Sequence, residues 1–213
     1  MKHRTTRSLY EYWRNRRQGR PAPSRADIEP SDIHGLLSDT FVLECDISQP
    51  AQFRLAGTRI CVLFNRELRG ADFTGLWRQQ SRETVASALD TIRRQKQCCV
   101  LGWRGHTARA NHVSGELVLL PLTMGGPQIT RMLGAMVTYD LPFWLGSEPI
   151  VDVELRSIRI FGPDDFETPV FKSSAATRLK NDALAIHGGI EQPRLPVRRV
   201  AHLDVYEGGR KAD

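Results

Sequence analysis

The side chains of this chain that could carry chemistry are few, and the four cysteines form the clearest set. Cys98 and Cys99 are adjacent, whereas Cys45 and Cys61 stand alone, so there is no C-x-x-C pair and no zinc-type spacing. We therefore expect buried, reduced thiols, because free cysteine is among the most buried residue types. A redox switch at the adjacent pair is the alternative.

Two histidines share a polar stretch, residues 106–114, which we expect to form a longer loop between two strands. His106 and His112 have no third metal ligand close by in sequence except Glu116, so we expect solvated histidines and no metal site. The alternative is a small anion site formed by Arg104, His106 and Arg109. Such a site would suit a phosphorylated or nucleotide ligand.

Known catalytic motifs are missing from the sequence. It contains no G-x-S-x-G elbow, no H-E-x-x-H and no dinucleotide fingerprint, and the GGPQ at residues 125–128 lacks the Gly-Lys pair of a P-loop. No kinase, cyclase or helix-turn-helix output domain is recognisable. We therefore expect a non-enzymatic protein that acts by binding another protein.

The formal net charge of +6 is concentrated at one end of the chain. Residues 1–25 carry eight Lys and Arg against Glu11 alone, so the remainder is close to neutral. A nucleic-acid-binding domain usually spreads basic residues over a folded face or groove. The pattern therefore indicates a basic segment attached to a neutral module, and it disfavours nucleic acid as a partner.

The basic segment is predicted to form a helix over residues 5–18. Leu9, Tyr12 and Trp13 make one apolar stripe at helical spacing, and Gly19 ends the helix. A helix this short is marginal alone, so its stripe needs a surface to pack on. We expect it to dock on its own domain or on a second copy in a homodimer. An anionic membrane surface or nucleic acid is the weaker alternative.

Length and composition fit one ordinary domain with extensions. The chain has 213 residues, of which 40% are hydrophobic and 25% charged, as in globular proteins with a real core. No apolar run is long enough to cross a bilayer, and no secretory signal is recognisable at the start. We therefore expect a cytoplasmic location.

The order of predicted elements indicates an α+β fold. A short helical stretch over residues 27–37 precedes the first strand, and a longer helix spans residues 81–95. Strand-like runs occupy residues 41–45, 52–56, 98–104, 115–123 and 131–140. This order predicts a five-stranded antiparallel sheet with short helices gathered on one face.

Residues 55–77, LAGTRICVLFNRELRGADFTGLW, are the most informative stretch. Gly57 permits a sharp exit from the strand, and Asn65 is suited to end the first short helix in a left-handed conformation. Gly70 ends a second helical turn, and Asp72 is placed to cap a third that carries Trp77. Several short helices with glycine hinges over a sheet favour a cavity between the two layers.

This order of parts resembles the PAS fold of sensory domains. More narrowly, the chain resembles a family of stand-alone PAS proteins of alphaproteobacteria. The resemblance rests on SLYEYW at residues 8–13, RPAP at 20–23, LAGT at 55–58, LRG at 68–70 and YEGGR at 206–210. It implies a non-enzymatic sensory or scaffolding protein that regulates a signalling partner, such as a histidine kinase, by protein–protein contact, with or without a small-molecule ligand.

The same geometry predicts which side chains would line a ligand pocket between the helices and the sheet. The candidates are Leu63, Phe64, Trp77 and Leu89 from the helices and Trp103, Leu119 and Met136 from the strands. The sequence around Cys61 does not match the reactive-cysteine motif of flavin photosensors, and the helix over residues 81–95 has no histidine for haem. We therefore expect neither cofactor, and the ligand stays unknown.

The last third of the chain is less regular. Residues 150–160 alternate apolar and polar side chains, which predicts one more strand or an extended arm. Beyond them the chain is polar and interrupted by Pro and Gly. We divide the chain into a basic helix and linker (1–25), a PAS core (26–147) and a C-terminal extension (148–213) that we expect to be partly flexible.

Overall fold

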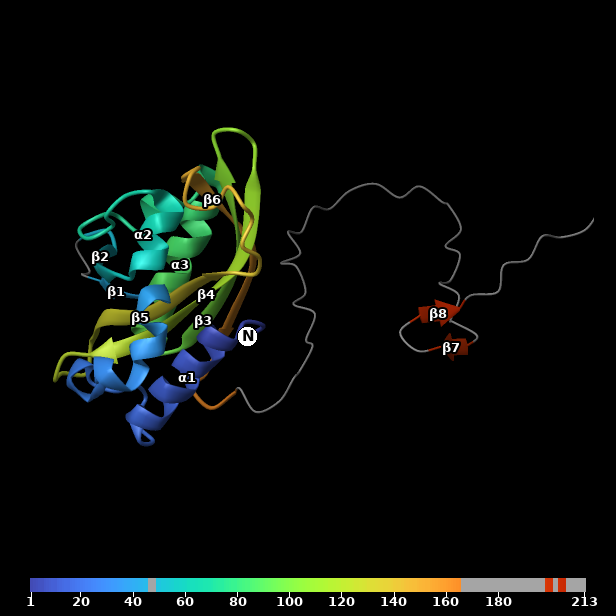
Figure 1. Ribbon diagram of the computed structural model, residues 1–213. Coiled ribbons are helices and arrows are strands. Elements are labelled where there is room, and N and C mark those ends of the chain that lie inside the picture. The colour runs from blue at the N-terminus through green and yellow to red at the C-terminus, as the bar shows by residue number, and fades with distance from the viewer. Residues whose placement is uncertain (46–48, 166–197, 201–202, 206–213) are drawn as a thin grey trace, which may run out of the picture. The chain divides into compact units, whose positions relative to one another are not determined.

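The structure analysed is a computed structural model that describes residues 1–45, 49–165, 198–200 and 203–205 (Figure 1). The chain forms two compact units, Met1–Val170 and Phe171–Asp213. The first unit extends past both ends of the predicted core range, 26–147. In the second unit, β7 (Arg198–Val200) pairs antiparallel with β8 (Leu203–Val205). The flexibility that we predicted for the extension concerns residues that lie mostly outside the described ones.

The first unit contains three α-helices and three 3-10 segments among its described residues. The α-helices are α1 (Arg4–Arg17), α2 (Thr58–Phe64) and α3 (Gln79–Gln95). The 3-10 segments are η1 (Arg25–Asp27), η2 (Pro30–Asp39) and η3 (Thr74–Leu76). No helix among the described residues is long and apolar enough to span a membrane.

One antiparallel sheet of six strands forms the centre of this unit, in the order β2-β1-β5-β4-β3-β6. The strands are β1 (Thr40–Glu44), β2 (Gln52–Ala56), β3 (Cys98–Thr107), β4 (His112–Thr123), β5 (Ile129–Thr138) and β6 (Ile150–Phe161). The α+β fold class is confirmed, but the predicted count of five strands is one too low. The alternating stretch over residues 150–160 is the sixth strand, because it pairs with β3 along its whole length.

Two local predictions are wrong. The polar stretch between β3 and β4 is not a long loop, because His106 pairs with His112 and the turn is confined to the few residues around Ala110. Its polar side chains alternate with Val113 and Gly115, which is the period of a strand with one wet face. The second helical turn, predicted to end at Gly70, does not form, and the Glu67 carboxylate instead accepts hydrogen bonds from the next two backbone N–H groups.

Helices cover both faces of the sheet. Leu117 pairs with Met136 and Leu119 with Gly134, and directly opposite residues of an antiparallel pair share a face. This face packs against α2 and α3. The alternate residues of β4, which include Val118 and Leu120, lie on the other face, and α1 crosses β4 and β5 there (Figure 1).

The α1 helix is part of the core of its own chain. Leu9, Tyr10 and Trp13 are fully buried, whereas Tyr12 is only partly buried. The Trp13 Nε1 donates a hydrogen bond of 2.8 Å to the Pro121 carbonyl oxygen, and the Tyr10 ring packs edge-on against Phe161. The apolar stripe predicted from the sequence therefore docks on its own domain.

A buried carboxylate fixes the start of α1. Glu116 is almost fully buried, and its side chain accepts hydrogen bonds from the backbone N–H groups of Lys2 (2.7 Å) and His3 (3.2 Å). The Thr6 hydroxyl donates to the same carboxylate. A negative charge at a helix N-terminus satisfies its free N–H groups and interacts favourably with the helix dipole. Glu116 therefore determines where on the sheet the helix begins.

Replacing Glu116 by Leu should loosen this end of the molecule. The N–H groups of Lys2 and His3 would lose their acceptor in a partly buried place, at a cost of about 1–3 kcal/mol in the free energy of unfolding. Urea denaturation would measure the loss, and hydrogen exchange should become faster first in residues 1–9. The exposed Glu83→Leu variant is the control and should change stability by about 0.5 kcal/mol or less. Equal losses in both variants would contradict this role.

Candidate functional site

The interior between the sheet and the helices α2 and α3 is filled by aromatic rings. Phe41 on β1 lies 5.5 Å from Phe53 on β2 and 5.9 Å from Phe73, measured between ring centroids. Phe73 in turn lies 6.0 Å from Trp77 in an edge-to-face arrangement. All four side chains are buried at 2% exposure or less. Such pairs stabilise a core beyond the area they bury.

Two glycines of the sheet leave room for the aromatic rings of Phe41 and Trp103. A Cβ atom at Gly134 would lie 2.2 Å from the Phe41 ring, and one at Gly115 would lie 2.5 Å from the Trp103 ring. Both distances are too short for a larger residue, and at Gly115 the Cβ atom would also lie 2.0 Å from the Val137 carbonyl oxygen. The space on which a ligand would rest in an open cavity is therefore occupied by the protein's own side chains.

The structure brings the predicted pocket residues into one place. All seven are buried members of a single hydrophobic core, namely Leu63, Phe64, Trp77, Leu89, Trp103, Leu119 and Met136. Leu89 also lines a hollow of about 230 Å³ beside Cys45 and Pro50. The prediction that these residues contact a ligand is not tested by their burial, since core side chains are buried with or without one.

Two indole groups in this interior have a feature that sequence reasoning missed. The Nε1 donors of Trp77 and Trp103 are buried and have no hydrogen-bond acceptor among the described residues. Leaving such a donor unpaired typically costs about 1–3 kcal/mol. By contrast, Trp13 on the other face donates to a carbonyl. The interior thus offers two donors to an acceptor from outside the chain.

A flavin does not fit this interior. The aromatic rings on Gly134 and Gly115 fill the space over the strands that a ring system would need. The thiol nearest in sequence to a flavin-type position, Cys61, is partly buried, and its Sγ lies 3.7 Å from the Glu67 carboxylate and 3.9 Å from the Ala56 carbonyl oxygen. The residues on α2 that enter the core are Ile60, Leu63 and Phe64.

The remaining cysteines are buried and chemically quiet. Burial raises the pKa of Cys45 and of Cys99 to about 12, and it also raises the pKa of Cys98. Because the thiolate is the nucleophile, these protonated thiols are poor candidates for redox chemistry. The structure shows no disulfide between the adjacent cysteines.

Two of the three residues of the predicted anion site lie beside carboxylates. The Arg104 Nε lies 3.5 Å from the Ser114 hydroxyl, and the His106 Nε2 lies 3.3 Å from Glu154. Arg109, in the hairpin turn, forms an ion pair of 3.4 Å with Glu148. Hydrogen bonds from Arg156 and then His106 lower the pKa of Glu154, which keeps it ionised. Among the described residues, no group of three or more His, Cys, Asp and Glu side chains could hold a metal ion.

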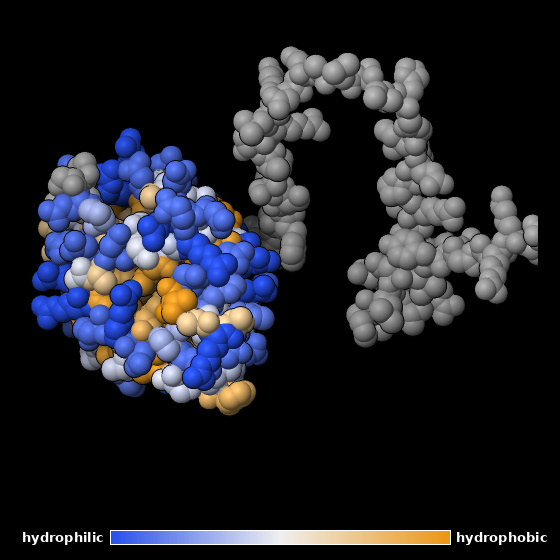
Figure 2. All heavy atoms as spheres, turned by 90° about the horizontal axis from the view of Figure 1, so that it is seen from above, coloured by the Kyte–Doolittle hydropathy of each residue, from blue (hydrophilic) through white to orange (hydrophobic). Residues whose placement is uncertain are grey.

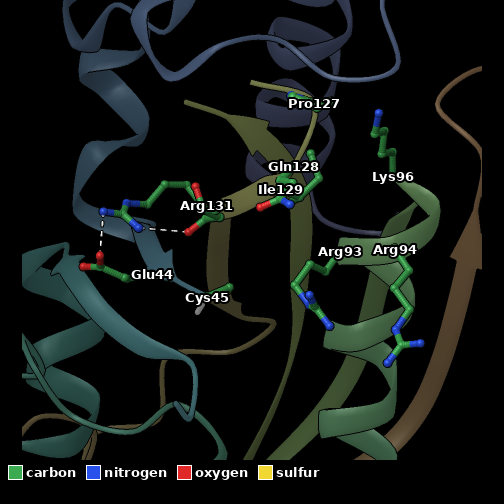
Figure 3. Close-up of a pocket in the computed structure, with 10 residues that line it drawn as sticks. Glu44, Cys45, Arg93, Arg94, Lys96, Pro127, Gln128, Ile129 and Arg131 are labelled. Carbon is green, nitrogen blue, oxygen red and sulfur yellow. Dashed lines mark hydrogen bonds and ion pairs between the residues drawn. The ribbon is translucent and has the colours of Figure 1, made fainter. Parts of the chain in front are cut away.

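A stronger concentration of positive charge lies elsewhere, at the end of α3. A hollow of about 500 Å³ is lined there by Arg93, Arg94, Lys96, Arg131 and Glu44 together with residues 127–130 (Figure 3). Arg131 lies on β5 at one side, and Arg93 and Arg94 lie on α3 at the other. This hollow was not predicted from the sequence, because Arg131 and residues 127–130 join the cations at the end of α3 only in the folded chain.

Large apolar side chains also reach the surface. Phe143 is 99% and Leu141 85% exposed, and both lie in the connection between β5 and β6. Figure 2 shows one face of the molecule, on which a small apolar group is surrounded by hydrophilic side chains. Exposed apolar groups on a folded domain are candidates for protein contacts when they cluster.

The six-stranded antiparallel sheet, with short helices over one face, defines the class of α+β domains to which this molecule belongs. Residues 1–137 match the sequence profile of a PAS domain, and the chain therefore belongs to the PAS-domain family. A search of curated proteins gave no match.

Solved structures with a similar arrangement include a light-oxygen-voltage protein and a PAS domain. A light-oxygen-voltage protein of Rhodobacter sphaeroides is 13% identical, with 55% of this chain and 71% of that chain covered, at a TM-score of 0.40. The PAS domain of an HTR-like protein from Haloarcula marismortui is 15% identical, with 51% and 89% covered, at a TM-score of 0.37. These scores are too low to support any conclusion about ligand or function.

Two tryptophan variants should distinguish an indole N–H that has a hydrogen-bond acceptor from one that has none. Trp13→Phe and Trp103→Phe remove the same atoms from fully buried sites, but only the first removes a hydrogen bond. We expect Trp13→Phe to lower the free energy of unfolding by about 1 kcal/mol more than Trp103→Phe. Urea denaturation of both variants measures the difference. A larger loss for Trp103→Phe would show that its N–H does have a partner.

The thiols should differ sharply in reactivity. With a disulfide reagent at pH 8, Cys61 should react first, because the other three thiols are buried whereas Cys61 is only partly buried. Partial burial raises the pKa of Cys61 too, so accessibility decides the order. The raised pKa values also imply stability that is fully present below pH 9 and falls as the pH rises toward 12. A Cys61→Ser variant should show no fast-reacting thiol. Rapid modification of Cys98 or Cys99 in the native protein would contradict this result.

Proposed function

We propose that this PAS-domain protein is a non-enzymatic sensor or scaffold that regulates a signalling protein, such as a histidine kinase, through direct contact. The filled interior carries the proposal. Phe41, Phe53, Phe73 and Trp103 occupy the space between the sheet and the helices. A module without room for a large cofactor is suited to transmit information through its surface.

The state of the potentially reactive groups supports a role without catalysis. Glu116 binds the start of α1, Glu148 accepts hydrogen bonds from Asn111 and Thr107, and three cysteines are protonated and buried. Each of these groups therefore has a structural partner or an apolar environment. An enzyme would need some of them exposed beside a cleft.

A small ligand is the second candidate, favoured by the two unpaired indole donors. A molecule that carries hydrogen-bond acceptors could satisfy the Nε1 of Trp77 or Trp103. To enter, it would have to displace aromatic side chains of the core. This version of the proposal makes the protein a sensor whose ligand changes the packing of the interior and, through it, the surface.

Binding of a membrane or nucleic acid by the N-terminal helix is disfavoured. Leu9 and Trp13 are fully buried on the sheet, so the apolar stripe cannot enter a bilayer unless α1 leaves its own core. For the same reason, a homodimer would have to use the outer surface of α1 or another part of the molecule. Dimerisation and a cytoplasmic location stay predictions, which light scattering and cell fractionation would check.

The function can be tested on purified histidine kinases from the organism that encodes this chain. Adding the protein should change the autophosphorylation rate of at least one kinase about fivefold, which is within the usual range of allosteric coupling. A Leu141→Ser/Phe143→Ser double variant tests whether the exposed apolar side chains contribute, and Val151→Ser on β6 is its exposed apolar control. If no kinase responds to the wild-type protein, the proposed function is wrong.

A further inference from the structure

Three hollows on the surface share lining residues. The hollow at the end of α3 and a second one, of about 260 Å³, are both lined by Arg131. The second hollow shares Arg25, Val42 and Arg54 with a third, of about 410 Å³, that ends at Arg69. We refer to these three hollows together as the basic groove.

The basic groove carries a large excess of positive charge. Seven cationic side chains line it, against two carboxylates. Arg131 and Arg54 share Glu44, at 2.7 and 3.6 Å, and Arg93 and Arg94 share Asp90, at 2.5 and 2.7 Å. Within the described part of the chain, no carboxylate pairs with the other three cations, which are Arg25, Arg69 and Lys96. The groove is therefore complementary to a ligand with several negative charges.

The length of the groove excludes most small anions as its full occupant. Its lining residues are distributed from the end of α3 over β5 and β1 to β2 and on to Arg69. Neighbouring strands lie about 4.8 Å apart, so the crossing from β5 to beyond β2 is about 15 Å before the α3 end is added. An extended peptide rises about 3.3 Å per residue, so this length suits about five residues or more.

Apolar side chains lie among the cations. Leu55 and Met124 are each about half exposed, and Val42 lies between them in the shared lining. None of the described lining residues is aromatic. Single-stranded nucleic acids are usually bound through aromatic side chains on which the bases stack. The combination of cations with aliphatic side chains fits an acidic peptide that carries some apolar residues better than it fits nucleic acid.

The charge of this chain's own segments makes them a poor match for the basic groove. Residues 171–213 carry eight basic and five acidic side chains, and the α1 segment is strongly basic. Either segment would bring like charge to the groove, whether from the same molecule or from a second copy. A different protein is therefore the better match.

We propose that the basic groove binds an acidic, partly apolar segment of a partner protein in an extended conformation. The inference rests on the proposed function, because it names the chemistry by which a signalling partner is held. Charge complementarity of this kind mainly sets the encounter rate and the choice of partner. The aliphatic side chains supply the apolar contact.

A labelled peptide of about twelve residues in which Glu and Leu alternate is a direct probe for fluorescence anisotropy. In an extended strand this peptide presents carboxylates on one side and Leu on the other. Arg54→Glu is the test variant, and Arg156→Glu is the matched control. Both arginines lie on edge strands and are exposed (61% and 51%), and each has one carboxylate partner.

We expect saturable, salt-sensitive binding that weakens about tenfold in Arg54→Glu, or about 1.4 kcal/mol, and less than about twofold in Arg156→Glu. Circular dichroism would confirm that both variants fold. Equal weakening by the two variants, or no saturable binding, would overturn the proposal. Tighter binding of an oligothymidine strand or of phosphatidylserine vesicles than of the peptide would also overturn it, in favour of a nucleic-acid or membrane surface.

The peptide-binding experiment and the kinase experiment can fail independently of each other. If the peptide binds in the groove but no kinase responds, the groove is correct and the regulatory role is wrong. If a kinase responds equally to wild type and Arg54→Glu, regulation stands and the groove proposal fails.

Discussion

The packing of α1 on the outer face of the sheet is the constraint on which the rest of the structure depends. Both faces of β4 are apolar, with Val118, Leu120 and Leu122 on the side that α1 covers. An antiparallel sheet can leave one face in water only if that face is polar. Here the second face must be covered, and Leu9 and Trp13 do so from within the same chain.

Glu116 fixes the position of α1 on the sheet. Apolar packing alone is not directional, so a helix with a Leu and a Trp could slide or rotate on a flat sheet. The carboxylate binds only the free N–H groups at the start of the helix. Trp13 adds a second fixed point two turns later, through Pro121. Together the two contacts fix the orientation of α1, and the loop after it then places Arg25 at the groove.

The sequence predicted most of the fold because its periodicities are strong. The helices α1 and α3 and the first five strands lie close to their expected limits, and Asn65 has the left-handed conformation expected for it (φ 48°). The alternating pattern of the sixth strand fits an edge strand and a free arm equally well, so the sequence does not decide between them. The seven pocket candidates are all buried core residues. An apolar residue type alone, however, does not distinguish a side chain that packs in the core from one that contacts a ligand. The basic groove was hidden because its arginines are distributed through a body of near-zero net charge.

The contact between α1 and β4 has a consequence for how the chain is made. Trp13 and its acceptor are 108 residues apart, and Thr6 and Glu116 are 110 apart. A ribosome adds about 5–20 residues per second, so α1 leaves the exit tunnel about 5–20 s before its binding surface exists. During that interval a basic helix with an uncovered Trp and Leu is free to meet other molecules. This chain should therefore depend on nascent-chain chaperones more than a PAS domain whose sheet has a polar outer face.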